Sequence, residues 1–283
     1  RNTSGKGTII RNVAAGVLDT DATNVKQVKE LVDTSKTHYY SVKSSNNNNF
    51  NNDLASGVDS MAAGVSAKAL GERSVAIGNN NEAQSTGSIT LGVGYSDGNA
   101  ATGLKQTLAI TGYEYNMAIG AGAQSAGNSS IAMGTLATSS IKNHGDAVDK
   151  AIAIGYSAGV SDNKAIAIGS DAKSNSKSAS ALGDTAQALA NDALAIGTQA
   201  QASGSASAAI GARSAVSGAN TYVVGSDNSN NPAGTGATIA ATNSGVFGNQ
   251  NRLEGNKNRL VGNSNTVKLE SMALLTTPKK IED

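Results

Sequence analysis

The sequence predicts a mainly β fold in which short parallel strands stack into an elongated coil that is stable only as a homotrimer. Three observations lead to this prediction. Short aliphatic segments ending in Gly recur at 14-residue intervals, one strand of each repeat is apolar on both faces, and aromatic residues make up only 3% of the chain. Since large aromatic side chains dominate most globular cores, we expect a thin core of Ala, Ile, Leu and Val in a repeat protein.

The 14-residue repeat is the dominant pattern of the chain. Its clearest run of glycines is Gly155, Gly169, Gly183, Gly197, Gly211 and Gly225. A fixed period of this kind is typical of proteins built from stacked supersecondary units. The recurring Gly, together with a second set in the other turn at Gly127, Gly204 and Gly218, predicts turns that need a positive φ.

Each repeat divides into two short strands. In the first strand the bulky aliphatic residues stand one and three positions before Gly, as in Ile166 and Ile168, and Ala lies between them. In the second strand, small residues such as Ala172 and Ser174 flank a polar residue such as Lys173. Because successive side chains alternate between faces, we expect the first strand to be buried on both sides and the second on one.

A single coil can bury only its inside, so the outer side of the first strands would form one long apolar stripe. Soluble monomers rarely expose such a stripe, and closed symmetry among copies of the chain would cover it. We therefore expect a set of aliphatic side chains to pack in the core or between copies. They are Ile77, Ile119, Ile154, Ile168, Ile196 and Ile210.

The first 60 residues lack the repeat. The segment 21–32 begins with capping residues and contains neither Gly nor Pro, which predicts a helix. Val25, Val28 and Val32 fall at i, i+3 and i+7 and form a short coiled-coil seam. β-Branched residues at both core positions of a seam favour trimers over dimers.

The period is broken near residues 95–116, 139–150 and 226–244, where we expect insertions that leave the coil as loops. Such loops either bind a ligand or are tolerated surface variation. The contact candidates are Tyr95, Tyr113, Glu114, Tyr115, Lys142, Asn143 and His144.

After Gly248 the Gly spacing halves to seven, which indicates the same coil with a more polar sequence. The tail 272–283 begins a helix or is a linker.

The sequence contains no recognisable arrangement of catalytic residues. The net charge is +1, which gives no sign of nucleic acid or membrane binding, and there is no Cys for a disulfide or a thiolate metal site. His38 and His144 have no metal-ligand partners at suitable spacing. A β-helical acyltransferase would need a period of six residues. We therefore expect no enzyme activity, no metal and no cofactor.

The repeats of the type Ile-Ala-Ile-Gly-Ser-Asp-Ala at 166–172 resemble the YadA-like head of trimeric autotransporter adhesins. The segments 10–16 and 19–28 resemble the neck motif of that family, and 38–42 resembles the connector before a head. The resemblance implies a left-handed parallel β-roll of three chains. It divides the chain into a neck and helix (1–37), a connector (38–60), a head (61–248), and polar terminal rungs with a C-terminal exit or linker (249–283).

The resemblance also implies a function. Such heads are exported to the bacterial cell surface, where they bind host cells, extracellular matrix proteins or other bacteria. The export signal and the membrane anchor are expected outside this segment. The alternative is a structural spacer that lifts a more distal head away from the membrane and binds nothing itself.

Overall fold

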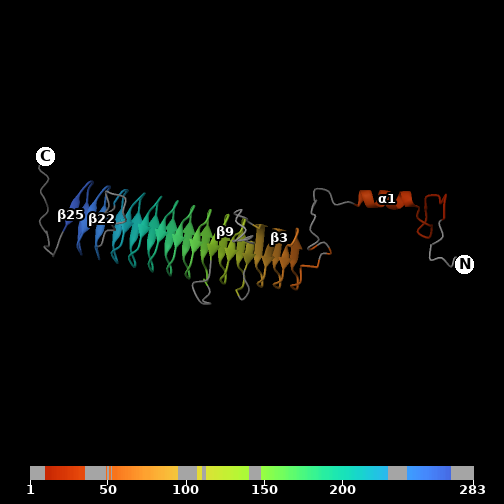
Figure 1. Ribbon diagram of the computed structural model, residues 1–283, viewed down its shortest axis with the longest axis horizontal. Coiled ribbons are helices and arrows are strands. Elements are labelled where there is room, and N and C mark those ends of the chain that lie inside the picture. Colours follow the sequence, from red (N-terminus) through yellow and green to blue (C-terminus); the bar gives the residue numbers. More distant parts are fainter. Residues whose placement is uncertain are drawn as a thin grey trace, which may run out of the picture. The chain divides into compact units, whose positions relative to one another are not determined.

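A computed structural model describes residues 10–35, 49, 51, 53–94, 107–109, 113–139, 148–228 and 241–268. The chain forms two compact units, residues 1–43 and residues 44–283. The described part of the first unit contains helix α1, and the second is a β-solenoid of about 12 turns of parallel strands. The expected mainly β repeat fold is therefore confirmed (Figure 1).

Helix α1 spans Val25–Thr34 and begins with a capping box. The Asn24 side chain accepts a hydrogen bond from the Gln27 backbone N–H at 3.0 Å, and the Gln27 side chain accepts one from the Asn24 N–H at 3.3 Å. Gln27 also exchanges two 2.9 Å hydrogen bonds with the backbone of Gly16. These bonds satisfy N–H groups that a helix start leaves unpaired, and they tie the preceding segment to the helix.

The strands of the second unit alternate between two sheets, so each turn of the chain contributes one strand to each (Figure 1). The larger sheet contains β1 (Met61–Ala63), β3 (Val75–Asn79), β5 (Ile89–Val93), β7 (Met117–Ile119), β9 (Ile131–Met133), β11 (Ile152–Ile154), β13 (Ile166–Ile168), β15 (Ser180–Leu182), β17 (Leu194–Ile196), β19 (Ala208–Ile210), β21 (Tyr222–Val224), β22 (Gly245–Phe247) and β24 (Arg259–Val261).

The second sheet contains β2 (Lys68–Ala69), β4 (Asn81–Ala83), β6 (Thr107–Ala109), β8 (Gln124–Ser125), β10 (Thr138–Ser139), β12 (Gly159–Val160), β14 (Lys173–Ser174), β16 (Gln187–Ala188), β18 (Gln201–Ala202) and β20 (Ala215–Val216). A two-stranded sheet of β23 (Arg252–Glu254) and β25 (Thr266–Lys268) follows. Here β22 and β24 still pair with a 14-residue register, Gly245 with Arg259, so the segment after Gly248 continues the coil as expected.

The register explains the three breaks in the period. Ile89 pairs directly with Met117, Ile131 with Ile152, and Tyr222 with Gly245, which are steps of 28, 21 and 23 residues. Each longer step is still a single turn of the coil. None of the three breaks therefore adds a further strand to the larger sheet.

The interior of the solenoid is filled mainly by Ala. In the larger sheet the second residue of each strand points inward, as Ala167, Ala181 and Ala195 do, and all three are completely buried. Small residues of the second sheet, such as Ala188 and Ala202, face them from the other side and are also completely buried. Most of the fully buried hydrophobic residues are Ala, joined toward the C-terminal end by larger ones such as Val223, Val246 and Leu253, and no described Ile is fully buried. The expectation that Ile would help to fill the interior is wrong.

The turns follow the expected rule in part. The glycines that end the strands of the larger sheet have a positive φ, for example +135° at Gly169. A Cβ there would collide with the backbone of Gly183 in the next rung. Gly127, Gly204 and Gly218 have no positive φ, so that expectation is wrong. In those turns the left-handed conformation falls two residues later, for example at Ala206.

The solenoid also begins earlier than the expected boundary at residue 61. Ala55 forms a parallel bridge with Ala69, and the backbone N–H of Ser56 donates to the Ala69 carbonyl at 3.0 Å. The first rung therefore starts inside the segment that we interpreted as a connector.

Candidate interaction surfaces

The outer side of the larger sheet carries two parallel columns of side chains, which we call the outer apolar face. The first column holds the residues three positions before the turn Gly, and the second column holds those one position before it. In most rungs both are aliphatic, as in Ile166 and Ile168 or Leu194 and Ile196. Ile168 and Ile196 are 37% and 36% exposed, whereas Ala167, which lies between the two columns in its strand, is completely buried.

The outer apolar face follows from the alternation of the strand. Because neighbouring side chains point to opposite sides, placing Ala inside forces both bulky residues outside. Ile77, Ile119, Ile154, Ile168, Ile196 and Ile210 all lie in the second column, where each is half-buried or exposed. In an isolated chain they therefore form a continuous apolar surface and are not part of the interior.

The outer side of the second sheet is polar. Lys173, Gln187 and Gln201 lie there, between the buried small residues of their strands. Lys68 and Glu82 form an ion pair of 3.4 Å between adjacent rungs. A shallow hollow of about 300 Å³ is lined by Thr185, Gln187, Gln199, Ala200 and Gln201. The solenoid thus has one apolar and one polar broad face.

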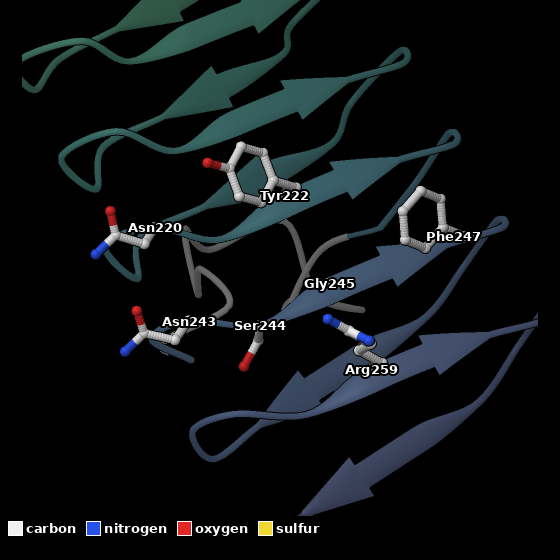
Figure 2. A pocket seen from close by; sticks show the side chains of 7 residues that line it. All are labelled: Asn220, Tyr222, Asn243, Ser244, Gly245, Phe247 and Arg259. Atoms are coloured by element: carbon white, nitrogen blue, oxygen red, sulfur yellow. The ribbon is translucent and has the colours of Figure 1, made fainter.

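A larger hollow interrupts the outer apolar face near its C-terminal end (Figure 2). It is open to the outside and measures about 560 Å³. It exists because Gly245 stands in the first column, where most strands carry a bulky residue. The lining residues are Asn220, Tyr222, Asn243, Ser244, Gly245, Phe247 and Arg259. Sequence reasoning did not identify this hollow, although the break of the aliphatic pattern at Gly245 is a signal that could have done so.

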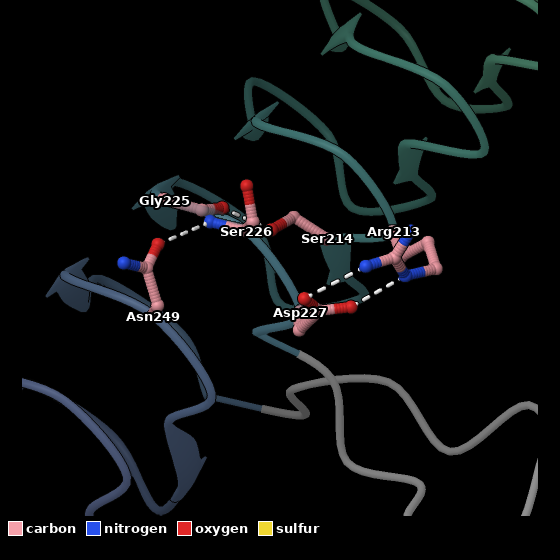
Figure 3. Close-up of polar contacts among 6 residues, drawn as sticks. All are labelled: Arg213, Ser214, Gly225, Ser226, Asp227 and Asn249. Atoms are coloured by element: carbon pink, nitrogen blue, oxygen red, sulfur yellow. Dashed lines mark hydrogen bonds and ion pairs between the residues drawn. The ribbon is translucent and has the colours of Figure 1, made fainter.

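Side chains in the turns link successive rungs through polar contacts (Figure 3). Arg213 donates two hydrogen bonds to the carboxylate of Asp227, at 2.5 and 2.9 Å. This pairing raises the pKa of the Arg213 guanidinium above its ordinary value, through the hydrogen bonds first and the charge of Asp227 second. The backbone N–H of Ser226 donates to Asn249 Oδ1 at 2.7 Å. These contacts hold neighbouring turns in line and contain no catalytic arrangement.

The predicted contact residues fall in two places. Tyr95, Lys142, Asn143 and His144 lie outside the described residues. Tyr113, Glu114 and Tyr115 were expected at the end of an insertion, and the structure places them just before β7. Tyr115 has a φ of +56°, the same as Ser129 one rung later. The Tyr115 N–H donates to the Thr86 carbonyl at 2.9 Å, and the Tyr115 ring lies over Gly87 while 58% exposed. The Glu114 N–H donates to Asn128 Oδ1 at 2.8 Å.

The N-terminal unit presents a second apolar surface. Val25, Val28 and Val32 of α1 are 71%, 47% and 56% exposed, and the helix buries none of its residues within the chain. The three valines are thus exposed on a helix of a single copy, and the coiled coil that they would form stays a prediction.

Within the described ranges, no group of three or more His, Cys, Asp or Glu residues is placed to hold a metal ion. The same part of the chain includes no helix with the length and apolar character that a membrane span requires.

Comparison with known proteins adds one finding. The family model described as "YadA head domain repeat (2 copies)" matches residues 55–81, 117–137, 149–172, 174–200 and 190–214. All five matched segments lie in the solenoid. A search of curated proteins gave no match.

Proposed function

Because the chain carries a YadA-like head of a trimeric autotransporter adhesin passenger, we propose that it is an adhesive cell-surface module that works as a homotrimer. The family is one of adhesins with a surface function and not of enzymes. The proposal has two parts. Three copies close over the outer apolar face, and the surfaces left outside that contact bind a host cell receptor, a matrix protein or a partner bacterium.

The outer apolar face is the observation that carries the first part. A row of half-exposed Ile, Leu, Val and Met side chains along the larger sheet exceeds what a soluble monomer ordinarily exposes. A closed cyclic assembly buries the same face on every copy. The exposed valines of α1 support the number three, because β-branched side chains at both seam positions favour three-stranded coiled coils.

Rigid aromatic side chains support the second part. Tyr115 is largely exposed, yet its backbone is fixed by the hydrogen bond to Thr86 and its ring by contact with Gly87. An exposed Tyr that is already ordered loses little conformational entropy on binding and offers both apolar area and a hydroxyl. Tyr115 and the neighbouring Glu114 are therefore our first candidates for ligand contact.

Absolute molar mass from light scattering, measured after size-exclusion chromatography, tests the trimer. We expect about three times the 28.1 kDa chain mass. A folded monomer would contradict the proposal.

Binding of the labelled trimer to cells and to matrix-coated surfaces tests adhesion. Tyr115→Ala should weaken binding, and Tyr156→Ala, which removes another exposed Tyr from the solenoid, is the matched control. Unchanged binding after Tyr115→Ala and after shortening of the segments 95–106 and 140–147 would contradict these binding sites. An intact trimer that binds nothing would instead identify the segment as a spacer within a longer fibre.

A further inference from the structure

The last four strands of the larger sheet depart from the uniform aliphatic pattern. In β19, β21, β22 and β24 the first column reads Ala208, Tyr222, Gly245 and Arg259, and the second column reads Ile210, Val224, Phe247 and Val261. In β22 the first column holds the smallest residue, Gly245, and the second column holds a large one, Phe247.

The regular part of the face cannot set the alignment between copies. Most rungs from β3 to β17 carry aliphatic residues in both columns, so a copy shifted by one rung would meet nearly the same side chains. Repetitive surfaces specify register weakly unless an irregular element penalises the alternatives. The irregular strands β21, β22 and β24 are such an element.

We propose that the Phe247 ring of one copy fills the hollow at Gly245 of the next copy, and that this contact fixes the register of the trimer. The inference rests on the trimer proposed above. In a cyclic assembly each interface is heterologous, so the first column of one copy faces the second column of its neighbour at the same rung. Gly245 then faces Phe247, and the Tyr222 ring faces the smaller Val224.

The neighbours of Gly245 penalise a shift in either direction. Along the first column, Tyr222 precedes Gly245 by one rung and Arg259 follows it. A shift one way would press the Phe247 ring of the partner against Tyr222, which overpacks the contact. A shift the other way would place the ring against the long side chain of Arg259, which offers it no hollow. Phe247 and Tyr222 are 48% and 52% exposed in the isolated chain, so their rings are available to a second copy.

The competing possibility is that Phe247 covers Gly245 of its own chain. A Cβ at Gly245 would lie 3.5 Å from Cε2 of that ring and 4.0 Å from Cγ of Arg259, so the chain's own side chains border the hollow. The pocket nevertheless stays open outward, between Tyr222 and Phe247 (Figure 2). A test must therefore distinguish contact within a chain from contact between chains.

The experiment co-expresses two chains with tags of different mass. One carries Gly245→Leu and the other carries Phe247→Ala, and native mass spectrometry counts the four possible trimers. Only mixed rings place the enlarged position against the truncated one. With equal amounts of the two chains, random mixing gives three mixed trimers for every homotrimer. We expect this ratio of mixed trimers to homotrimers to rise by about twofold or more, the lower range of couplings between packed side chains. Binomial mixing, or sorting into homotrimers, would overturn the inference.

Two controls keep the result interpretable. Wild-type chains with the two tags should mix binomially, as should chains carrying Gln187→Ala and Gln201→Leu on the polar face. If the larger substitutions prevent assembly, the milder pair Gly245→Ala and Phe247→Leu gives the same comparison. A wild-type chain that is monomeric in this measurement contradicts the proposed trimer itself. A wild-type trimer with binomial mixing in both test pairs contradicts only the register contact.

Discussion

The backbone N–H of Asn251 donates a 2.9 Å hydrogen bond to the side-chain Oδ1 of Asn228 in the preceding rung, and both residues are at most 1% exposed. The next rung repeats the contact, because the N–H and the side-chain amide of Asn265 both donate to Asn251 Oδ1 at 3.1 Å. In the polar terminal rungs a column of asparagines therefore stands beside an interior that stays apolar at Val246 and Leu253. A buried amide is tolerated there because its donors and acceptors are paired.

The buried asparagine column predicts a large effect for Asn251→Ala. The substitution removes the acceptor of the Asn265 N–H and the donor that bonds the Gly262 carbonyl at 2.6 Å. An unsatisfied buried group costs about 1–3 kcal/mol, so the midpoint of urea unfolding should fall clearly. Asn249→Ala is the control, since Asn249 makes the same kind of bond, 2.7 Å from the Ser226 N–H, in an exposed turn where water replaces it. Equal losses for the two variants would contradict the assignment of the column as buried.

The stacked turn glycines predict that Gly169→Ala is destabilising. Gly169 has a φ of +135°, and its Cβ would meet the Gly183 backbone of the next rung. Strain of this kind costs on the order of 1–3 kcal/mol. Asp171→Ala in the same turn should be much milder, because Ala206 already adopts the left-handed conformation that Asp171 has. Thermal unfolding followed by circular dichroism compares the two, and a Gly169→Ala variant as stable as Asp171→Ala would exclude the strain.

The 14-residue period predicted the larger sheet correctly because its spacing is strict between Gly155 and Gly225. The same pattern could not decide which face of the first strand is inside. Ala167 and Ile168 are both apolar, and only the packing of the two sheets against each other shows that Ala167 is the one inside. The hollow at Gly245 was also beyond the repeat analysis, since it depends on how Tyr222, Phe247 and Arg259 surround a missing side chain.

The turn before helix α1 predicts a pH dependence. Asp21 Oδ2 accepts hydrogen bonds from the backbone N–H groups of Leu18 at 2.9 Å and Val17 at 2.8 Å, and these bonds lower the pKa of the carboxyl group. Because the folded pKa is lower than the unfolded one, the stabilisation is complete above the ordinary pKa of 3.8. It disappears as the pH falls through the lowered value.

Amide chemical shifts of Val17 and Leu18, followed by NMR through an acid titration, measure this effect. In the wild type they should move together at a pH below the ordinary range of an Asp carboxyl group. Asp21→Asn should remove the titration from both amides. A midpoint at or above the ordinary value would contradict the hydrogen-bonded turn.

The outer apolar face predicts that Ile168→Asp separates folding from assembly. Ile168 is 37% exposed in a single copy, so a carboxylate there can stay hydrated in the isolated solenoid. Within the trimer the same group would be buried without a partner, which costs several kcal/mol. We therefore expect a β-rich chain by circular dichroism that elutes with the mass of a monomer. Gln201→Lys, on the polar face of the second sheet, should keep the trimer mass. An Ile168→Asp trimer, or a Gln201→Lys monomer, would show that the interface lies on another face of the solenoid.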